Sequence, residues 1–279
     1  MTKRLAAIAA FLLASCAGPA LADVPRPWEF NFQEPASTSM ERIVEFHTGL
    51  LWVITAISLF VLGLLVWVIY RYREGRNPTP SRTTHNTLIE VIWTVVPVII
   101  LVVIFIPSYR MMVANDKVAD ADMTLKIIGH QWYWSYEYPD QGNFTFDANM
   151  VFESDLEDPS KRLMETDNRV VLPVGKKIRL IMTSTDVLHS WGVPALGIKM
   201  DAVPGRLNET WVEITKPGVF YGFCSELCGI NHSFMPIAIE GVSESDFEAW
   251  VTKAQQEFAR VDGPAAGPSV RMAQSAPVE

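Results

Sequence analysis

Two cysteines, a histidine and a methionine lie close together in the segment FCSELCGINHSFMP, residues 223–236. Several ligands from one short loop can surround a metal ion, and thiolate and thioether ligands select copper over hard cations. One Cys, one His and one Met in such a loop is the pattern of mononuclear blue-copper sites, which take another histidine from upstream. The segment therefore predicts a metal site, built from Cys224, Cys228, His232 and Met235.

A second histidine, His189, lies upstream in a predicted loop after the strand that ends near Thr185. Two thiolates, two imidazoles and a thioether exceed one tetrahedral site and suit two copper ions bridged by both sulfurs. Sharing one electron between two bridged ions reduces the structural change on oxidation and reduction, which favours electron transfer over substrate chemistry. The residues leave two alternatives open: a disulfide between the cysteines, which leaves His232 and Met235 unused, and structural zinc, which has no use for Met235.

Two long apolar runs in the first half of the chain predict transmembrane helices. Residues 50–70 carry no charge, and the second run carries only Glu90 near its start. At about 1.5 Å per residue, each run is long enough to cross a hydrocarbon core of about 30 Å. The arginine-rich connection is expected to stay in the cytoplasm, which places the rest of the chain outside. We expect helices at about 48–70 and 88–109, joined by the loop 71–87 into a hairpin over residues 47–110.

The N-terminus has the features of an export signal. Two basic residues precede an apolar run, and the small residues ALA at positions 20–22 offer a cleavage site. We therefore expect a signal peptide over residues 1–22 and an outer N-terminal segment over residues 23–46. The stretch LASC, which ends at Cys16, also resembles a lipoprotein cleavage site, so lipidation of Cys16 is the alternative.

The outer part of the chain changes to alternating hydrophobic residues with Pro, Gly and Asp at the turns, which predicts an all-β sandwich or barrel over residues 111–242. An amphipathic helix is expected over residues 243–260 and a disordered tail over residues 261–279. Acids outnumber bases in this part, and the whole chain carries a net charge of −8, which suits either a basic macromolecular partner or plain solubility. The strands expected here are 125–138, 168–175, 177–185, 209–215 and 218–223.

Aromatic residues gather in the first of these strands, GHQWYWSYEY. Period-two alternation along one strand would put His130, Trp132, Trp134, Tyr136 and Tyr138 on the same face. Core packing is the expectation for most of these rings.

Five motifs resemble, in order, those of subunit II of the haem-copper cytochrome c oxidases. They are THNTLIEVIWTVVP, GHQWYWSYEYP, TSTDVLHSW, KMDAVPGR and CSELCGINHSFMP, and they extend over nearly the whole chain after the signal. The resemblance implies a membrane-anchored all-β protein, in which a two-helix transmembrane hairpin precedes a cupredoxin-like Greek-key β-barrel or sandwich with a dinuclear CuA centre. It assigns no role to residues 151–167 or to the C-terminal tail.

The resemblance also implies roles for individual residues. The backbone carbonyl of Glu226 completes the shell of one copper, and its carboxylate helps to hold a magnesium ion shared with the catalytic subunit. Trp132 is the residue at which electrons enter, and Glu90 is the entrance of a proton pathway. The implied copper ligands are His189, Cys224, Glu226, Cys228, His232 and Met235, and the implied docking acids for cytochrome c are Glu137, Asp147, Asp186 and Asp201.

The resemblance implies a subunit of an oxidoreductase and translocase, cytochrome c oxidase of the bacterial type. The subunit takes electrons from cytochrome c at CuA and passes them to haem in subunit 1, with subunit 3 as a further partner and no role for nucleic acid. The resemblance also implies that the chain lies in a bacterial inner membrane, with its C-terminal domain in the periplasm. The alternative is the copper-free scaffold subunit of a quinol oxidase, against which the intact ligand set argues. The chain has five histidines and none lies in either apolar run, so oxygen reduction is expected in a partner subunit.

Overall fold

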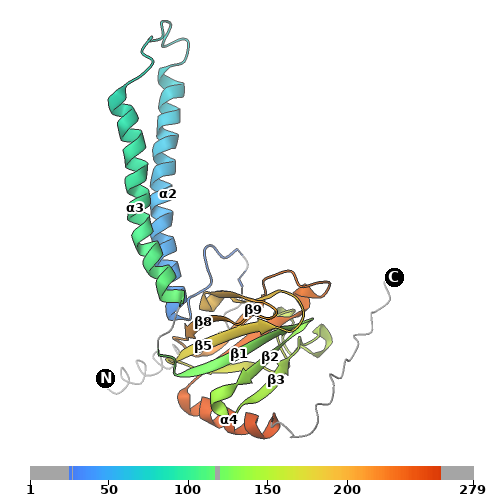
Figure 1. The fold of residues 1–279 in the computed structure, drawn as a ribbon. Helices are drawn as coiled ribbons and strands as arrows, with labels where there is room; N and C mark the ends of the chain where they lie inside the picture. The colour runs from blue at the N-terminus through green and yellow to red at the C-terminus, as the bar shows by residue number, and fades with distance from the viewer. Residues whose placement is uncertain (1–24, 27, 117–119, 259–279) are drawn as a thin grey trace, which may run out of the picture.

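The computed structural model describes residues 25–26, 28–116 and 120–258. A helical hairpin rises from one end of a β domain, and a C-terminal helix lies on the side of that domain away from the hairpin (Figure 1). The predicted signal peptide 1–22, Cys16 and the tail 261–279 lie outside the described residues.

Two helices, α2 (Thr38–Arg71) and α3 (Thr87–Asp116), form the hairpin, and both are long and apolar enough to cross a membrane. Both extend beyond the expected bounds, since α2 begins at Thr38 rather than near residue 48 and α3 ends at Asp116 rather than 109. The side chain of Ser37 accepts the backbone N–H of Met40 and so caps α2. Apolar runs mark only the part of a helix that faces lipid, whereas these extra turns reach the β domain, where Ser39 and Met40 are buried.

Within the described residues, ten strands form two five-stranded sheets, which confirms the predicted β-sandwich architecture. The first sheet contains, in order, β3 (Phe144–Ala148), β2 (Tyr133–Tyr138), β1 (Met123–His130), β5 (Lys177–Ser184) and β8 (Asn208–Glu213). The second contains β4 (Val170–Pro173), β10 (Pro236–Val242), β9 (Gly218–Cys224), β6 (His189–Val193) and β7 (Ile198–Ala202). Most pairs are antiparallel, but β1 with β5 and β4 with β10 are parallel. Of these strands, β3, β6, β7 and β10 lie outside the ranges expected from the sequence.

The single aromatic strand predicted over residues 125–138 is wrong, because β1 and β2 are the two arms of a hairpin that turns at Gln131 and Trp132. His130 pairs with Tyr133 across the turn, so the alternation of side chains between the two faces does not continue from β1 into β2. The side chains of Trp134, Tyr136 and Tyr138 still share one buried face, since they belong to β2 alone. The sequence gives no signal for this turn, because both arms have alternating side chains and the turn itself contains no Gly or Pro.

The hairpin is joined to the β domain by side chains of α2, α3 and β8. The Arg42 guanidinium lies over the Trp211 ring, 5.5 Å from its centroid, and 3.4 Å from the Asn115 side-chain oxygen. Trp211 Nε1 donates to the carbonyl of Ala114 at the end of α3, at 3.0 Å. These contacts fix how the domain sits on the hairpin.

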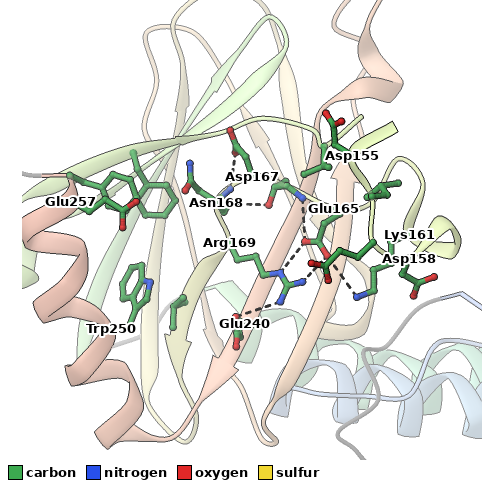
Figure 2. Close-up of a pocket in the computed structure, with 17 residues that line it drawn as sticks. Asp155, Asp158, Lys161, Glu165, Asp167, Asn168, Arg169, Glu240, Trp250 and Glu257 are labelled. Atoms are coloured by element: carbon green, nitrogen blue, oxygen red, sulfur yellow. Dashed lines mark hydrogen bonds and ion pairs between the residues drawn. The ribbon is translucent and has the colours of Figure 1, made fainter. Parts of the chain in front are cut away.

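The C-terminal helix is present as α4 (Glu244–Glu257), capped by the side chain of Ser243, which accepts the backbone N–H of Asp246. Beside it a cavity of about 500 Å³ opens between α4, β4 and the segment 151–169 (Figure 2). Its wall contains an ionic network in which Arg169 Nε and Nη2 bind the Glu165 carboxylate at 2.9 and 2.7 Å. The Tyr221 hydroxyl also donates to Glu165, at 2.9 Å.

Arg169→Met is expected to reduce the free energy of unfolding by about 1–3 kcal/mol at neutral pH, because it leaves a half-buried carboxylate without its main partner. Burial raises the pKa of Glu165, but the Arg169 hydrogen bond and charge outweigh it and hold that pKa below its usual range. A depressed carboxyl pKa stabilises the fold above the ordinary Glu pKa of about 4.3, and that contribution is lost as the pH falls through the folded value. The difference in the free energy of unfolding between Arg169→Met and the unmodified protein should therefore become smaller as the pH falls.

Denaturant unfolding of the detergent-solubilised chain, followed by tryptophan fluorescence at several pH values, measures this difference. Arg162→Met is the matched control, because Arg162 pairs with Glu153 at 3.1 Å while both side chains are more than half exposed. Arg162→Met should reduce the free energy of unfolding by less than about 0.5 kcal/mol. An equal cost for the two variants would contradict a structural role for the Glu165 network.

Candidate metal centre

The predicted metal ligands converge where β6 and β9 lie side by side. Cys224 is the last residue of β9, and Trp191 of β6 pairs with it in the sheet. His189 is the first residue of β6, not a loop residue as expected. Cys228 and Met235 follow in the connection between β9 and β10, and both are buried.

The two cysteines are free thiols whose Sγ atoms lie 3.8 Å apart. A disulfide requires about 2.05 Å, so the structure holds no bond between them. One ion at a metal–thiolate distance of about 2.3 Å can contact both sulfurs across this gap. The ligand atoms of His189, Cys224 and Cys228 all lie within 4.8 Å of one another, so the set fits a metal centre.

The other predicted donors surround the thiol pair. His232 Nδ1 lies 3.4 Å and Met235 Sδ 3.5 Å from Cys228 Sγ. The carbonyl oxygen of Glu226 lies 3.3 Å from Cys224 Sγ, while the Glu226 side chain is on the exposed surface of the loop. All six predicted ligand residues are therefore brought together, and both histidines turn Nδ1 toward a sulfur.

The two thiols differ in how easily they lose a proton. Burial raises the pKa of Cys224, but hydrogen bonds with His189 and the Ser190 backbone outweigh it and lower that pKa. Burial and the neighbouring Cys224 raise the pKa of Cys228. Since the thiolate is the metal ligand, Cys224 takes the ligating form more readily than Cys228.

The turn between β1 and β2 lies against the ligand loop. Gln131 Nε2 and Trp132 Nε1 both donate to the carbonyl oxygen of Cys228, at 2.8 and 3.2 Å. Gly229 has φ +122°, and a Cβ there would lie 3.1 Å from the Trp132 ring and from Gln131 Nε2. A glycine is needed at this position for both reasons. Trp132 therefore connects the partly exposed surface of the turn to a cysteine of the centre.

His189 is held by groups around its ring. Its Nδ1 lies 3.8 Å from Cys224 Sγ, and its Nε2 lies 2.8 Å from Asp186 Oδ1. A Cβ on Gly129 would lie 2.9 Å from its Cδ2, so the β1 backbone packs directly on the ring. The Trp134 ring meets it edge-on, with the centroids 5.8 Å apart. Sequence reasoning missed Gly129 and Gln131, whose only signal was their position inside the aromatic motif GHQWYWSYEY.

The predicted docking acids differ in how far they face solvent. Asp201 is exposed, with Lys199 at 3.7 Å, and Asp147 is exposed while its Oδ1 accepts the Ser135 hydroxyl. Glu137 is paired with Lys126 at 2.9 Å and only 16% of its side chain is exposed. Asp186 is the one of the four that contacts a predicted ligand.

Glu90 lies away from the metal centre, in the first turn of α3 at the end of the hairpin distant from the β domain (Figure 1). Its Oε1 accepts the backbone N–H of Asn86 at 3.1 Å, and the Asn86 side chain accepts that of Ile89 at 3.2 Å. Glu90 therefore helps to cap α3.

Comparison with known proteins gives two family matches. The family described as cytochrome C oxidase subunit II, periplasmic domain, matches residues 123–242, and the family described as cytochrome C oxidase subunit II, transmembrane domain, matches residues 25–111. These ranges cover the β domain and the hairpin.

Individual relatives agree. A probable cytochrome c oxidase subunit 2 of Rickettsia bellii is 53% identical over 230 residues, covering 82% of this chain and 86% of the relative. The cytochrome c oxidase subunit 2 of Oenothera berteroana is 49% identical over 239 residues, covering 84% and 93%.

Among solved structures, the periplasmic domain of subunit II of the Bradyrhizobium japonicum cytochrome oxidase is 51% identical, with a TM-score of 0.48, covering 51% of this chain and 100% of that one. The family is one of copper-binding, membrane-anchored subunits of an oxidoreductase complex that takes part in electron transport. The paired thiols, the helical hairpin and both family matches lead to one conclusion: this chain belongs to the cytochrome c oxidase subunit II family.

Proposed function

We propose that this chain accepts electrons from cytochrome c at a dinuclear CuA centre and passes them to haem in the catalytic subunit, where oxygen reduction is coupled to proton pumping. The observation that carries this proposal is the pair of unbridged thiols 3.8 Å apart, with two imidazoles, a thioether and a carbonyl around it. A copper-free quinol-oxidase scaffold has no use for this donor set, so it is not favoured.

The copper pair, when bound, supplies a one-electron carrier whose charge is shared between two ions. The ligands are His189, Cys224, Cys228, His232, Met235 and the carbonyl of Glu226. The protein keeps the thiols, His189 and Met235 buried, which excludes water from the sulfurs. Because β6 and β9 hold two of the ligands in one sheet, these ligands need little movement when the charge changes.

Trp132 is the residue at which electrons enter in this proposal. Its ring is partly exposed at the β1–β2 turn, and its Nε1 donates to the carbonyl of Cys228 at 3.2 Å. The indole thus lies one hydrogen bond from the backbone of a copper ligand. Glu137, Asp147, Asp186 and Asp201 are the proposed docking acids for a basic cytochrome c.

The ligand loop is proposed to face the catalytic subunit. Leu227 and Ile230 are 76% and 87% exposed there, and such apolar side chains on a metal loop suit a protein partner. The neighbouring carboxylate of Glu226 is proposed to hold a magnesium ion shared with subunit 1, and subunit 3 is a further proposed partner. The chain is proposed to lie in a bacterial inner membrane, with the β domain in the periplasm and Glu90 at the cytoplasmic entrance of a proton pathway.

Metal content tests the dinuclear assignment. The full chain, purified alone in detergent and loaded with copper, is expected to bind two copper ions per chain and to give the multi-line electron paramagnetic resonance of a mixed-valence pair. Elemental analysis and the resonance spectrum measure both quantities. One copper per chain with a simple four-line signal, or exclusive binding of zinc, would overturn the proposal.

A further inference from the structure

Asp186, in the connection between β5 and β6, is enclosed by hydrogen-bond donors from two different parts of the fold. Its Oδ1 accepts the backbone N–H of Val187 at 2.6 Å and lies 2.8 Å from His189 Nε2. Its Oδ2 accepts the backbone N–H of Gln131 at 2.6 Å. The Ser184 hydroxyl lies 3.1 Å from Oδ1. Both oxygens therefore make contacts inside the protein, although 29% of the side chain is exposed.

The contact with His189 fixes the ring of a proposed copper ligand. A carboxylate can only accept, so the proton of the neutral imidazole lies on Nε2 and the lone pair is on Nδ1, the atom that faces Cys224. A carboxylate bound to the far nitrogen of a metal-binding histidine sets both the orientation of its ring and its basicity. Gly129 packs against the same ring, so the imidazole is held by its edge and by its side.

The contact with Gln131 holds the turn that carries Trp132. Gln131 Nε2 and Trp132 Nε1 of this turn donate to the carbonyl oxygen of Cys228. The backbone N–H of Gln131 donates to Asp186, so the carboxylate holds the backbone of the turn. One carboxylate therefore connects a ligand of the centre to the turn through which electrons are proposed to enter. Moving Oδ2 would shift the backbone of this turn, and with it the indole, relative to Cys228.

We propose that Asp186 is a positioning residue of this centre, which orients the His189 ring and seats Trp132 against the Cys228 carbonyl, and that this role outweighs its charge among the proposed docking acids. The inference rests on the proposed function. A docking charge acts through its field, so a carboxylate displaced by one methylene still serves, and salt screens its effect. A positioning carboxylate acts through the exact location of its oxygens. A glutamate, which displaces the carboxylate, should therefore be as harmful as an asparagine, which removes the charge.

Asp186→Glu and Asp186→Asn in the purified oxidase separate the two roles, with Asp201→Asn as the matched control. Asp201 has a side chain that is 52% exposed and contacts no proposed ligand. Both Asp186 variants are expected to lower kcat about tenfold at low and high ionic strength alike, and to shift the near-infrared band and the midpoint potential of the copper centre. Asp201→Asn is expected to raise KM at low ionic strength only, with the band and the potential unchanged.

The copper affinity of the full chain alone provides a second readout that does not require assembly of the oxidase. Copper titration should show a loss of about 10-fold to 100-fold in both Asp186 variants. Asp186→Glu behaving like the unmodified protein, or Asp186 variants that change KM alone in a salt-dependent way, would overturn the inference. If the unmodified chain binds two coppers, either of these results contradicts only the positioning role of Asp186. If the unmodified chain does not bind two coppers, the proposed function itself is contradicted.

Discussion

Trp132→Ala is expected to lower the rate of electron transfer from cytochrome c about a hundredfold or more, because it removes the side chain that reaches from the surface turn to the carbonyl of Cys228. The loss should appear in kcat, since the acids proposed to dock cytochrome c remain in place. Stopped-flow reduction of the copper centre by reduced cytochrome c measures the step directly.

Two comparisons make this result specific. Trp132→Phe keeps an aromatic ring but loses the Nε1 donor, so it should retain an intermediate rate. Tyr133→Phe changes the adjacent residue, whose ring stacks on His130 with the centroids 4.5 Å apart, and should leave the rate near that of the unmodified protein. The near-infrared band of the centre must persist in every variant. An unchanged reduction rate in Trp132→Ala, with the band intact, would remove Trp132 from the electron route.

Cys228→Ser is expected to abolish the dinuclear centre, so that the chain binds at most one copper and the oxidase loses at least about a hundredfold of its activity. Serine offers a hydroxyl that stays protonated at neutral pH, and it cannot replace a bridging thiolate. Copper analysis and electron paramagnetic resonance should show the change from a mixed-valence signal to that of a single ion.

Glu226→Gln is the matched control in the same loop. The proposed copper ligand at this position is the backbone carbonyl, which lies 3.3 Å from Cys224 Sγ and is unchanged by the substitution. The variant should therefore keep two coppers per chain while losing the carboxylate proposed to hold magnesium. Two coppers and an intact near-infrared band in Cys228→Ser would show that Cys228 does not bridge the pair.

The composition of the metal site and of the membrane anchor could be read from the sequence, because both are properties of short segments. Cys224, Cys228, His232 and Met235 lie in one loop, and ligand chemistry depends on residue type more than on distant context. Uncharged runs long enough to cross a membrane are equally local. The ends of the helices were misplaced, because the added turns are held by contacts with the β domain and not by lipid.

Only the tertiary structure decided how the site is arranged around these ligands. The turn at Gln131 and Trp132 contains no Gly or Pro, so alternation suggested one strand, and the hairpin became clear only from the pairing of β1 with β2. The bond from Gln131 to Cys228 joins residues 97 apart in the chain, and the bond from Gln131 to Asp186 joins residues 55 apart. The first contact arises from the packing of the two sheets and the second from the pairing of β1 with β5, and no local pattern records either. The connection between β5 and β6 turns Asp186, an acid expected at the docking surface, toward His189, only three residues further along the chain.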